Sequence, residues 1–211
     1  MEKSNVSLYN PESFWKIDNV LLKGELHLAK VYLKLSDMMN YDQLQKFYSD
    51  EKRKGNPHPI SIPDWRAIAE AGKENKDFMN FNQNISKQSP NFYTSIEYSP
   101  SESEDKIFHY EYSSEEQIIR GEFVGPDNRI KDIKDLKTLE ALIGMNNSDS
   151  LNNLSNLING TEMFLWRLNS KPEEKVKFVG ELYADSVRLD LDAYGCPSGE
   201  HPALRVLIQK Q

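Results

Sequence analysis

The chain contains a single cysteine, Cys196, among its 211 residues. No disulfide can form within the chain, and this cysteine usage is typical of a reducing compartment. The first fifteen residues do not combine a positive start with an apolar run, as a secretory signal would. No apolar stretch approaches the roughly 18–20 residues needed to span a bilayer. These absences predict a cytoplasmic protein without a membrane partner.

An excess of basic residues is also missing. Lysine and arginine number 26 against 33 aspartates and glutamates, which gives a net charge of −7. The imbalance is local: residues 1–90 carry 13 basic and 12 acidic side chains, whereas residues 91–211 carry 13 and 21. Because binding phosphates requires clustered lysine and arginine, the composition argues against a nucleic-acid partner. It leaves a basic protein open as a partner.

The familiar fingerprints of catalysis and cofactor binding are absent. The sequence has no glycine-rich phosphate loop, no G-x-S-x-G, no H-E-x-x-H and no paired C-x-x-C. Hydrophobic residues make up 38% and charged residues 28%, a globular composition. We therefore expect a folded protein with no cofactor, and the missing motifs lean against an enzyme.

Residues 1–90 are predicted to form a helical N-terminal part. Apolar residues at three- and four-residue steps predict a helix from Asp18 to about Met39, with Asp18 as its cap. The same pattern predicts helices over 41–54 and 64–71, separated by a proline-rich connector. Residues 73–90 are polar and weakly periodic, so a further helix and a linker both stay open.

From about residue 91 the apolar period changes from 3.6 to 2, which predicts a β-rich part over 91–211. Strands are expected at 92–98, 106–112, 117–124, 162–169, 175–183, 186–192 and 203–209, with amphipathic helices near 130–143 and 150–158. The short turns imply antiparallel pairing. The predicted class is α+β: N-terminal helices, then a mainly antiparallel sheet of about seven short strands, packed as one globular unit.

The stretch from Asp190 to His201 contains the residue types most suited to chemistry. Asp190, Asp192 and His201 are candidate metal ligands, but their spacing matches no known zinc or calcium pattern. Cys196 is a candidate nucleophile with His201 as its base. The simpler interpretation is preferred: the aspartates alternate with leucines as solvent-facing residues of a half-buried strand, and Cys196 is an inert thiol.

A second feature combines acidic residues and tyrosines on the first three predicted strands. Tyrosine supplies contact area together with a hydroxyl, and acidic loops steer basic partners. The candidate protein-binding residues are Tyr93, Glu97, Glu102, Glu104, Tyr110 and Glu111. His109 lies among these carboxylates, where its protonated form would be favoured, although a solvated strand position is the preferred interpretation.

Three functional hypotheses result. The leading one is a non-enzymatic protein-interaction component, such as an adaptor, an inhibitor or immunity-type protein, or a subunit of a larger assembly. The alternative is a small metal- or cysteine-dependent hydrolase that uses the loop with Cys196 and His201. A small-molecule binder, with its ligand between helices and sheet, is a third class that no feature of the sequence favours.

Overall fold

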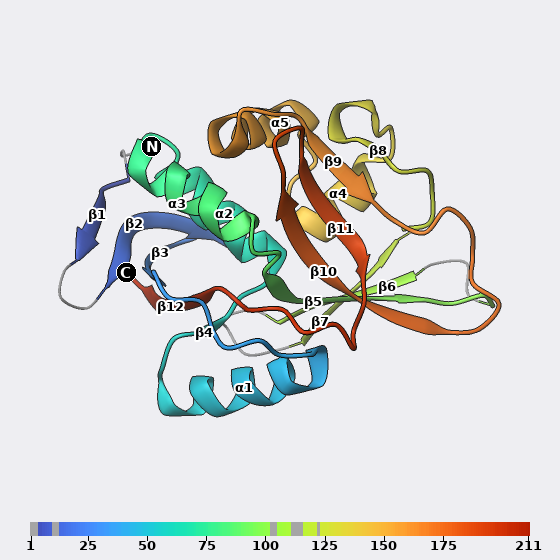
Figure 1. Ribbon diagram of the computed structural model, residues 1–211, viewed down its shortest axis with the longest axis horizontal. Helices are drawn as coiled ribbons and strands as arrows, with labels where there is room; N and C mark the ends of the chain where they lie inside the picture. Colours follow the sequence, from blue (N-terminus) through green and yellow to red (C-terminus); the bar gives the residue numbers. More distant parts are fainter. Residues whose placement is uncertain (1–3, 10–12, 102–104, 111–115, 122) are drawn as a thin grey trace.

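The described residues form two mainly antiparallel sheets and five α-helices, so the predicted α+β class is confirmed (Figure 1). The structure is a computed structural model that describes residues 4–9, 13–101, 105–110, 116–121 and 123–211; the side chains at 110 and 116–120 are outside the description. Within these ranges no helix is long and apolar enough to cross a membrane.

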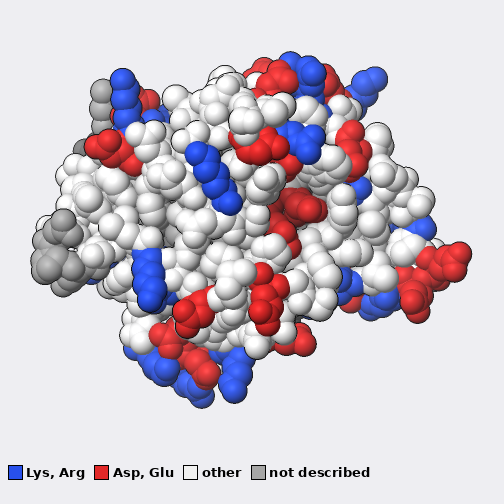
Figure 2. All heavy atoms as spheres, in the orientation of Figure 1, with Lys and Arg blue, Asp and Glu red and all other residues white. Residues whose placement is uncertain are grey.

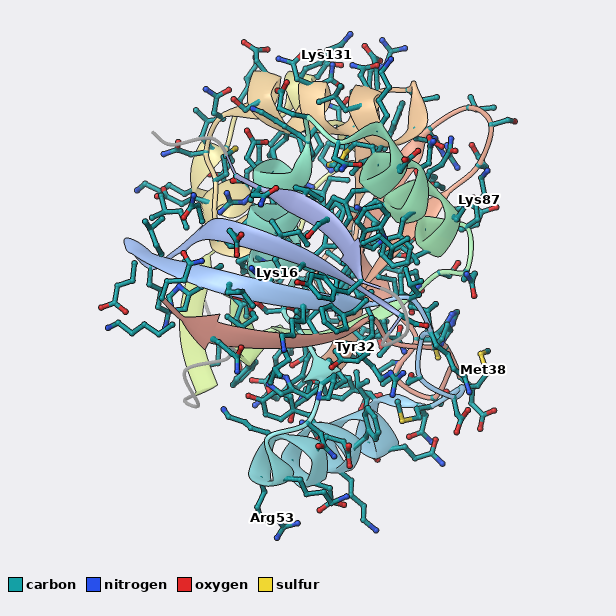
Figure 3. All side chains as sticks on the ribbon, turned by 90° about the vertical axis from the view of Figure 1, so that its left-hand side faces the viewer. Lys16, Tyr32, Met38, Arg53, Lys87 and Lys131 are labelled. Carbon is teal, nitrogen blue, oxygen red and sulfur yellow. The ribbon has the colours of Figure 1, made fainter. Side chains whose placement is uncertain are left out.

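The first sheet, sheet A, joins the two ends of the chain. Its strands are β1 (Val6–Tyr9), β2 (Phe14–Leu22), β3 (Glu25–Tyr32), β12 (Arg205–Lys210) and β4 (His58–Pro59), in that spatial order. All its pairings are antiparallel. Figure 3 shows this sheet from its solvent side, with Lys16 of β2 and Tyr32 of β3 labelled.

The helix predicted from Asp18 to Met39 is wrong, because this segment forms the β2–β3 hairpin. Lys23 and Gly24 make the turn with φ angles of 49° and 82°, the left-handed pair that suits a two-residue hairpin loop. Alternation buries Val20 and Leu22 on one strand and Ala29 and Val31 on the other. Leucines seven residues apart satisfy the helical period, but pairing of β3 with β12 decides the conformation.

The second sheet, sheet C, contains seven strands. In spatial order they are β7 (Glu116–Gly121), β6 (Asp105–Tyr110), β5 (Asn91–Tyr98), β10 (Val176–Ala184), β11 (Leu189–Gly195), β9 (Met163–Trp166) and β8 (Asn128–Arg129). Only β9 and β11 pair in parallel among these strands. Six correspond to predicted strands; β8 was not predicted, and the predicted strand at 203–209 joins sheet A instead as β12.

The helices predicted after residue 40 are confirmed with small shifts of their ends. They are α1 (Tyr41–Lys54), α2 (Ile62–Gly72), α3 (Lys76–Ser86), α4 (Leu136–Ile143) and α5 (Ser148–Asn159). The segment 73–90 thus contains a helix, and the predicted helix over 130–143 is divided into a 3-10 turn, Ile130–Asp132, and α4. Side chains cap the helices as expected: Asn40 and Gln43 form a capping box at the start of α1.

Two hydrophobic cores hold these layers together. The main core joins sheet A, α2 to α5 and one face of sheet C, and includes Trp15, Trp65 and Phe78. A smaller core lies under α1 and contains Tyr48, Tyr93 and their neighbours. The main core draws residues from both sides of position 90, since β2 and α2 pack in it together with β5 and β11.

Candidate functional site

The antiparallel pair β10–β11 carries acidic side chains on the face of sheet C away from the main core. Leu182 pairs with Leu191 and both are buried, whereas the next pair along, Glu181 and Asp192, points to the opposite face. Asp190 lies two residues before Asp192, on the same face of β11. We call Glu181, Asp190 and Asp192 the carboxylate hollow. Figure 2 shows acidic side chains sunk into a depression over β10 and β11.

A glycine makes room for this hollow. A Cβ atom at Gly195 would lie only 2.3 Å from Oε1 of Glu181 and 2.8 Å from its Cγ. Any side chain at position 195 would therefore displace the Glu181 carboxylate. The register of β10 also shifts between Val179 and Glu181, and such bulges redirect side chains. Gly195 and the bulge together set the position of Glu181.

Burial makes the two facing carboxyl groups weak acids. Burial, together with a smaller effect of the nearby charge of Asp192, raises the pKa of Glu181 to about 7. Burial likewise raises the pKa of Asp192 to about 6, although its Oδ1 accepts a hydrogen bond of 2.8 Å from the backbone N–H of Tyr194. The neighbouring charges of Asp190 and Asp127 also raise the Asp192 pKa. The site thus holds a proton near neutral pH.

Asp190 differs because it has a cationic partner. Its Oδ2 accepts a hydrogen bond of 3.0 Å from Nε of Arg188, so the charge of this aspartate is compensated. The Arg188 guanidinium also lies 4.6 Å from the ring centroid of Trp166 and 5.7 Å from that of Phe164. This stacking holds the arginine against the sheet. Because Arg188 pairs with Asp190, Glu181 and Asp192 are the carboxyl groups of the hollow that have no arginine or lysine partner among the described residues.

No lysine or arginine in the described ranges forms an ion pair with Glu181 or Asp192. Among the residues that the structure describes, the basic group in contact with Glu181 is His201, whose Nε2 lies 4.0 Å from Oε1 of Glu181. Oε1 itself is buried and accepts no hydrogen bond. The pair is thus partly buried, acidic and, within the described residues, without an ion pair to lysine or arginine.

Aromatic side chains surround the hollow. Trp166 of β9 is the neighbour of Asp192 in register, and Tyr183 of β10 is the neighbour of Asp190. Tyr183 is 42% exposed, which makes it available to a partner. Tyr194 stands beside Asp192 on the same strand face and packs edge-on against Phe178. The carboxylates of the hollow can bind a cation, and the aromatic rings around them offer apolar surface to the side chain that carries the cation.

The predicted loop residues Cys196 and His201 lie near this site and make different contacts. Cys196 is exposed, and its Sγ lies 3.1 Å from the Ser198 hydroxyl. Hydrogen bonds from the Ser198 side chain and from the backbone of Ser198 and Gly199 lower the pKa of this thiol. His201 is fixed by backbone hydrogen bonds to Met39 and faces Glu181.

The predicted metal ligands do not converge. Asp190 pairs with Arg188, Asp192 accepts a backbone N–H, and His201 faces Glu181. In the part of the chain that the structure describes, no three histidine, cysteine or acidic side chains are arranged to hold a metal ion. The donors that the sequence analysis grouped are thus each engaged elsewhere.

The predicted acidic and tyrosine-bearing surface is only partly within the described residues. Tyr93 is 3% exposed and packs in the core under α1, with its ring centroid 4.2 Å from that of Tyr48. Glu97 forms ion pairs with Lys106 and Lys175. The remaining predicted positions, Glu102, Glu104, Glu111 and the side chain of Tyr110, lie outside the described residues.

His109 is buried, so the expectation of a solvated strand position is wrong. It is 1% exposed, with Nδ1 3.0 Å from the Thr94 hydroxyl and Nε2 2.6 Å from the carbonyl oxygen of Ala141. Burial lowers the pKa of His109 to about 4, against the opposing effect of the Ala141 hydrogen bond. The imidazole links β5 and β6 to α4 and is a neutral structural group rather than a partner of surface glutamates.

Sequence reasoning missed Glu181, the central residue of the hollow. It lies in a strand that was predicted, at 175–183, but nothing local distinguishes it from other strand glutamates. Its role depends on lying opposite Asp192 and below Gly195, which are contacts between residues far apart in sequence. The chain matches no family model, no curated protein and no solved structure.

Proposed function

We propose that this chain is a non-enzymatic protein-interaction component that binds a basic partner by taking a lysine or arginine side chain into the carboxylate hollow. The observation that carries the proposal is the facing pair Glu181–Asp192, half-buried side by side without an ion pair to lysine or arginine in the described residues. Two adjacent buried carboxyl groups are destabilised until a cation or a proton joins them.

The surroundings favour a cation that arrives on a flexible apolar chain. A lysine or arginine brings three or four methylene groups that can lie against the aromatic rings of Trp166 and Tyr183. The half-exposed Tyr183 is of the type enriched at protein interfaces. An adaptor, an inhibitor or immunity-type protein, or a complex subunit would use such a surface in the same way.

Binding of the cation should release a proton. Because the pKa of Glu181 is about 7 and that of Asp192 about 6, part of the pair is protonated at neutral pH. A lysine or arginine that enters the hollow favours the ionised forms and expels that proton. Affinity for the basic partner should therefore increase as the pH rises from about 6 to about 8.

Carboxyl-to-amine coupling with a carbodiimide in native lysate tests the proposal for a partner lysine, because it joins a carboxylate to an amine that lies against it. An arginine does not couple, and co-elution with a partner by size-exclusion chromatography covers that case. We expect cross-links on peptides that contain Glu181 or Asp192, and we expect them to be lost in Glu181→Gln and Asp192→Asn. Glu174→Gln, at an exposed glutamate before β10, is the matched control. If neither carboxyl group is cross-linked and the protein elutes as a monomer without a partner, the proposal fails.

A second candidate function is a cysteine-dependent hydrolase, favoured by the lowered pKa of the exposed Cys196 thiol. A low thiol pKa increases the thiolate fraction, which is the nucleophile. Iodoacetamide alkylation across pH decides it. If Cys196 reacts no faster than free cysteine at neutral pH, the cysteine-dependent hydrolase is ruled out. If elemental analysis finds no bound metal in the purified protein, the metal-dependent hydrolase is ruled out as well.

A further inference from the structure

A groove of about 830 Å³ lies between the β2–β3 hairpin and helix α2, on a different part of the protein from the carboxylate hollow. The turn end of the hairpin, at the left in Figure 3, forms one wall. Residues of α2, together with Met145 two positions beyond the end of α4, form the other. The lining residues are Ser4, Asn19, Leu21, Lys23, Gly24, Leu26, Arg66, Ala67, Glu70, Ala71, Lys73 and Met145.

The floor and walls of the groove are apolar. Leu21 and Leu26 are cross-strand partners and remain 51% and 47% exposed, although adjacent residues of the hairpin are buried. Ala67 and Ala71 lie one turn apart on α2, where their small side chains leave the space open. Ligand pockets of about 300–1,000 Å³ are typically apolar with a few polar groups at defined places. The groove has this size and this composition.

The rim of the groove is positively charged. Lys23, Arg66 and Lys73 lie there with a single acidic residue, Glu70, which pairs with Lys73. The Arg66 guanidinium donates hydrogen bonds of 3.3 Å to the carbonyl of Ile143 and 3.2 Å to that of Gly144. No carboxylate of the described chain forms an ion pair with it, and burial lowers the pKa of Arg66. Arg66 is thus a partly buried cation that retains unused donors.

We propose that this groove binds a small amphipathic carboxylate, with its apolar chain against Leu21, Leu26 and Ala71 and its anionic head on Arg66. Charge complementarity selects the head group, because Arg66 lies at the rim and no carboxylate of the described residues forms an ion pair with it. A planar carboxylate can accept two parallel hydrogen bonds from a guanidinium, which favours Arg66 over the lysines as its anchor. The apolar walls select the chain.

The proposal has a quantitative consequence for chain length. Each methylene group buried in the groove should strengthen binding about fourfold. Decanoate should therefore bind on the order of a hundredfold more tightly than hexanoate, provided the four additional methylenes are buried. Decyltrimethylammonium offers the same chain with the opposite charge, so it should bind at least about tenfold more weakly than decanoate.

Isothermal titration calorimetry with these three compounds, below their micelle concentrations, tests chain and head group on the wild-type protein. Leu26→Glu places a negative charge inside the groove and should weaken decanoate binding about tenfold or more. Leu157→Glu is the matched control, because Leu157 is 51% exposed, close to the 47% of Leu26, and lies on helix α5 outside the groove. Circular dichroism verifies that both variants fold.

Amide chemical shifts locate the bound ligand. We expect decanoate to perturb residues 21–26 and 66–73 and to leave β10 and β11 unchanged. Arg66→Gln should weaken decanoate binding and reduce the preference over decyltrimethylammonium; if this variant fails to fold, the wild-type head-group comparison decides. Equal binding of the two head groups, no decanoate binding, or equal losses in Leu26→Glu and Leu157→Glu would each overturn the proposal.

Discussion

Replacing Glu181 by glutamine should stabilise the protein at and above neutral pH and have little effect in mild acid. The pKa of Glu181 is about 7 in the folded protein and 4.5 in the unfolded reference. Below about pH 4.5 the carboxyl group is protonated in both states, so it contributes no pH dependence. Between these two values the unfolded chain releases the proton while the folded protein keeps it. Stability therefore falls as the pH rises, until both states are ionised above about pH 7.

The magnitude follows from the size of the pKa difference. Each pKa unit corresponds to about 1.4 kcal/mol, so the full difference gives an upper bound of about 3 kcal/mol. Part of this pKa difference comes from the charge of Asp192, which itself titrates near pH 6, and the Glu181 side chain is 12% exposed, so the real contribution is smaller than this bound. Glutamine resembles the protonated acid in shape and carries no charge. We expect Glu181→Gln to be about 1–3 kcal/mol more stable than wild type near pH 8.

Urea unfolding of wild type, Glu181→Gln and the exposed control Glu174→Gln, at about pH 5 and about pH 8, measures this difference. The control should follow the wild-type pH dependence, since Glu174 is exposed at the entry to β10. A Glu181→Gln variant that is less stable than wild type near pH 8, or that keeps the same pH dependence, would refute a buried and uncompensated carboxyl pair. A gain in stability with loss of the carbodiimide cross-links would fit a site that sacrifices stability for binding.

Three further predictions address other parts of the structure. Gly195→Ala should destabilise the protein by about 1–3 kcal/mol, because its Cβ would overlap the Glu181 carboxylate, and thermal unfolding should show a smaller loss in a Glu181→Ala background. The His109 imidazole should keep its neutral chemical shifts from about pH 8 down to about pH 5, since burial lowers its pKa to about 4; an NMR titration midpoint above about pH 6 would contradict this placement. Gly24→Val should destabilise the hairpin by about 1–2 kcal/mol in urea unfolding, because a β-branched residue is strained at a φ of 82°, whereas Gly24→Asn should cost less.

Sequence signals between neighbouring residues were sufficient to predict most helices and strands after residue 40. The capping box at Asn40 and Gln43 and the left-handed Gly55 define α1 within its own sequence. Pro63 in the first turn and the Ser61 cap do the same for α2. These features act between residues close in the chain, so a pattern in the sequence can identify them.

Pairing between distant segments decided the elements that were mispredicted. The β2–β3 hairpin fits a helical period as well as a strand period, and it becomes a sheet because β12 completes it from the other end of the chain. Contact between distant segments also decides the state of His109. Its imidazole is buried against the Ala141 carbonyl of α4, more than thirty residues later in the chain. Alternation alone assigned His109 to the correct strand but not to the buried face.

The sequence by itself determined the α+β class, most of the helices and strands, and the placement of Asp190 and Asp192 on one face of a strand. These properties follow from periodicity, capping and turn chemistry, which are local. Only the tertiary structure decided that Glu181 faces Asp192 below Gly195, that His201 joins Glu181 rather than Cys196, and that Leu21 and Leu26 face α2 across a groove. Each of these depends on strand register or on packing between distant elements, and a one-residue change of register would place every side chain of a strand on the opposite face.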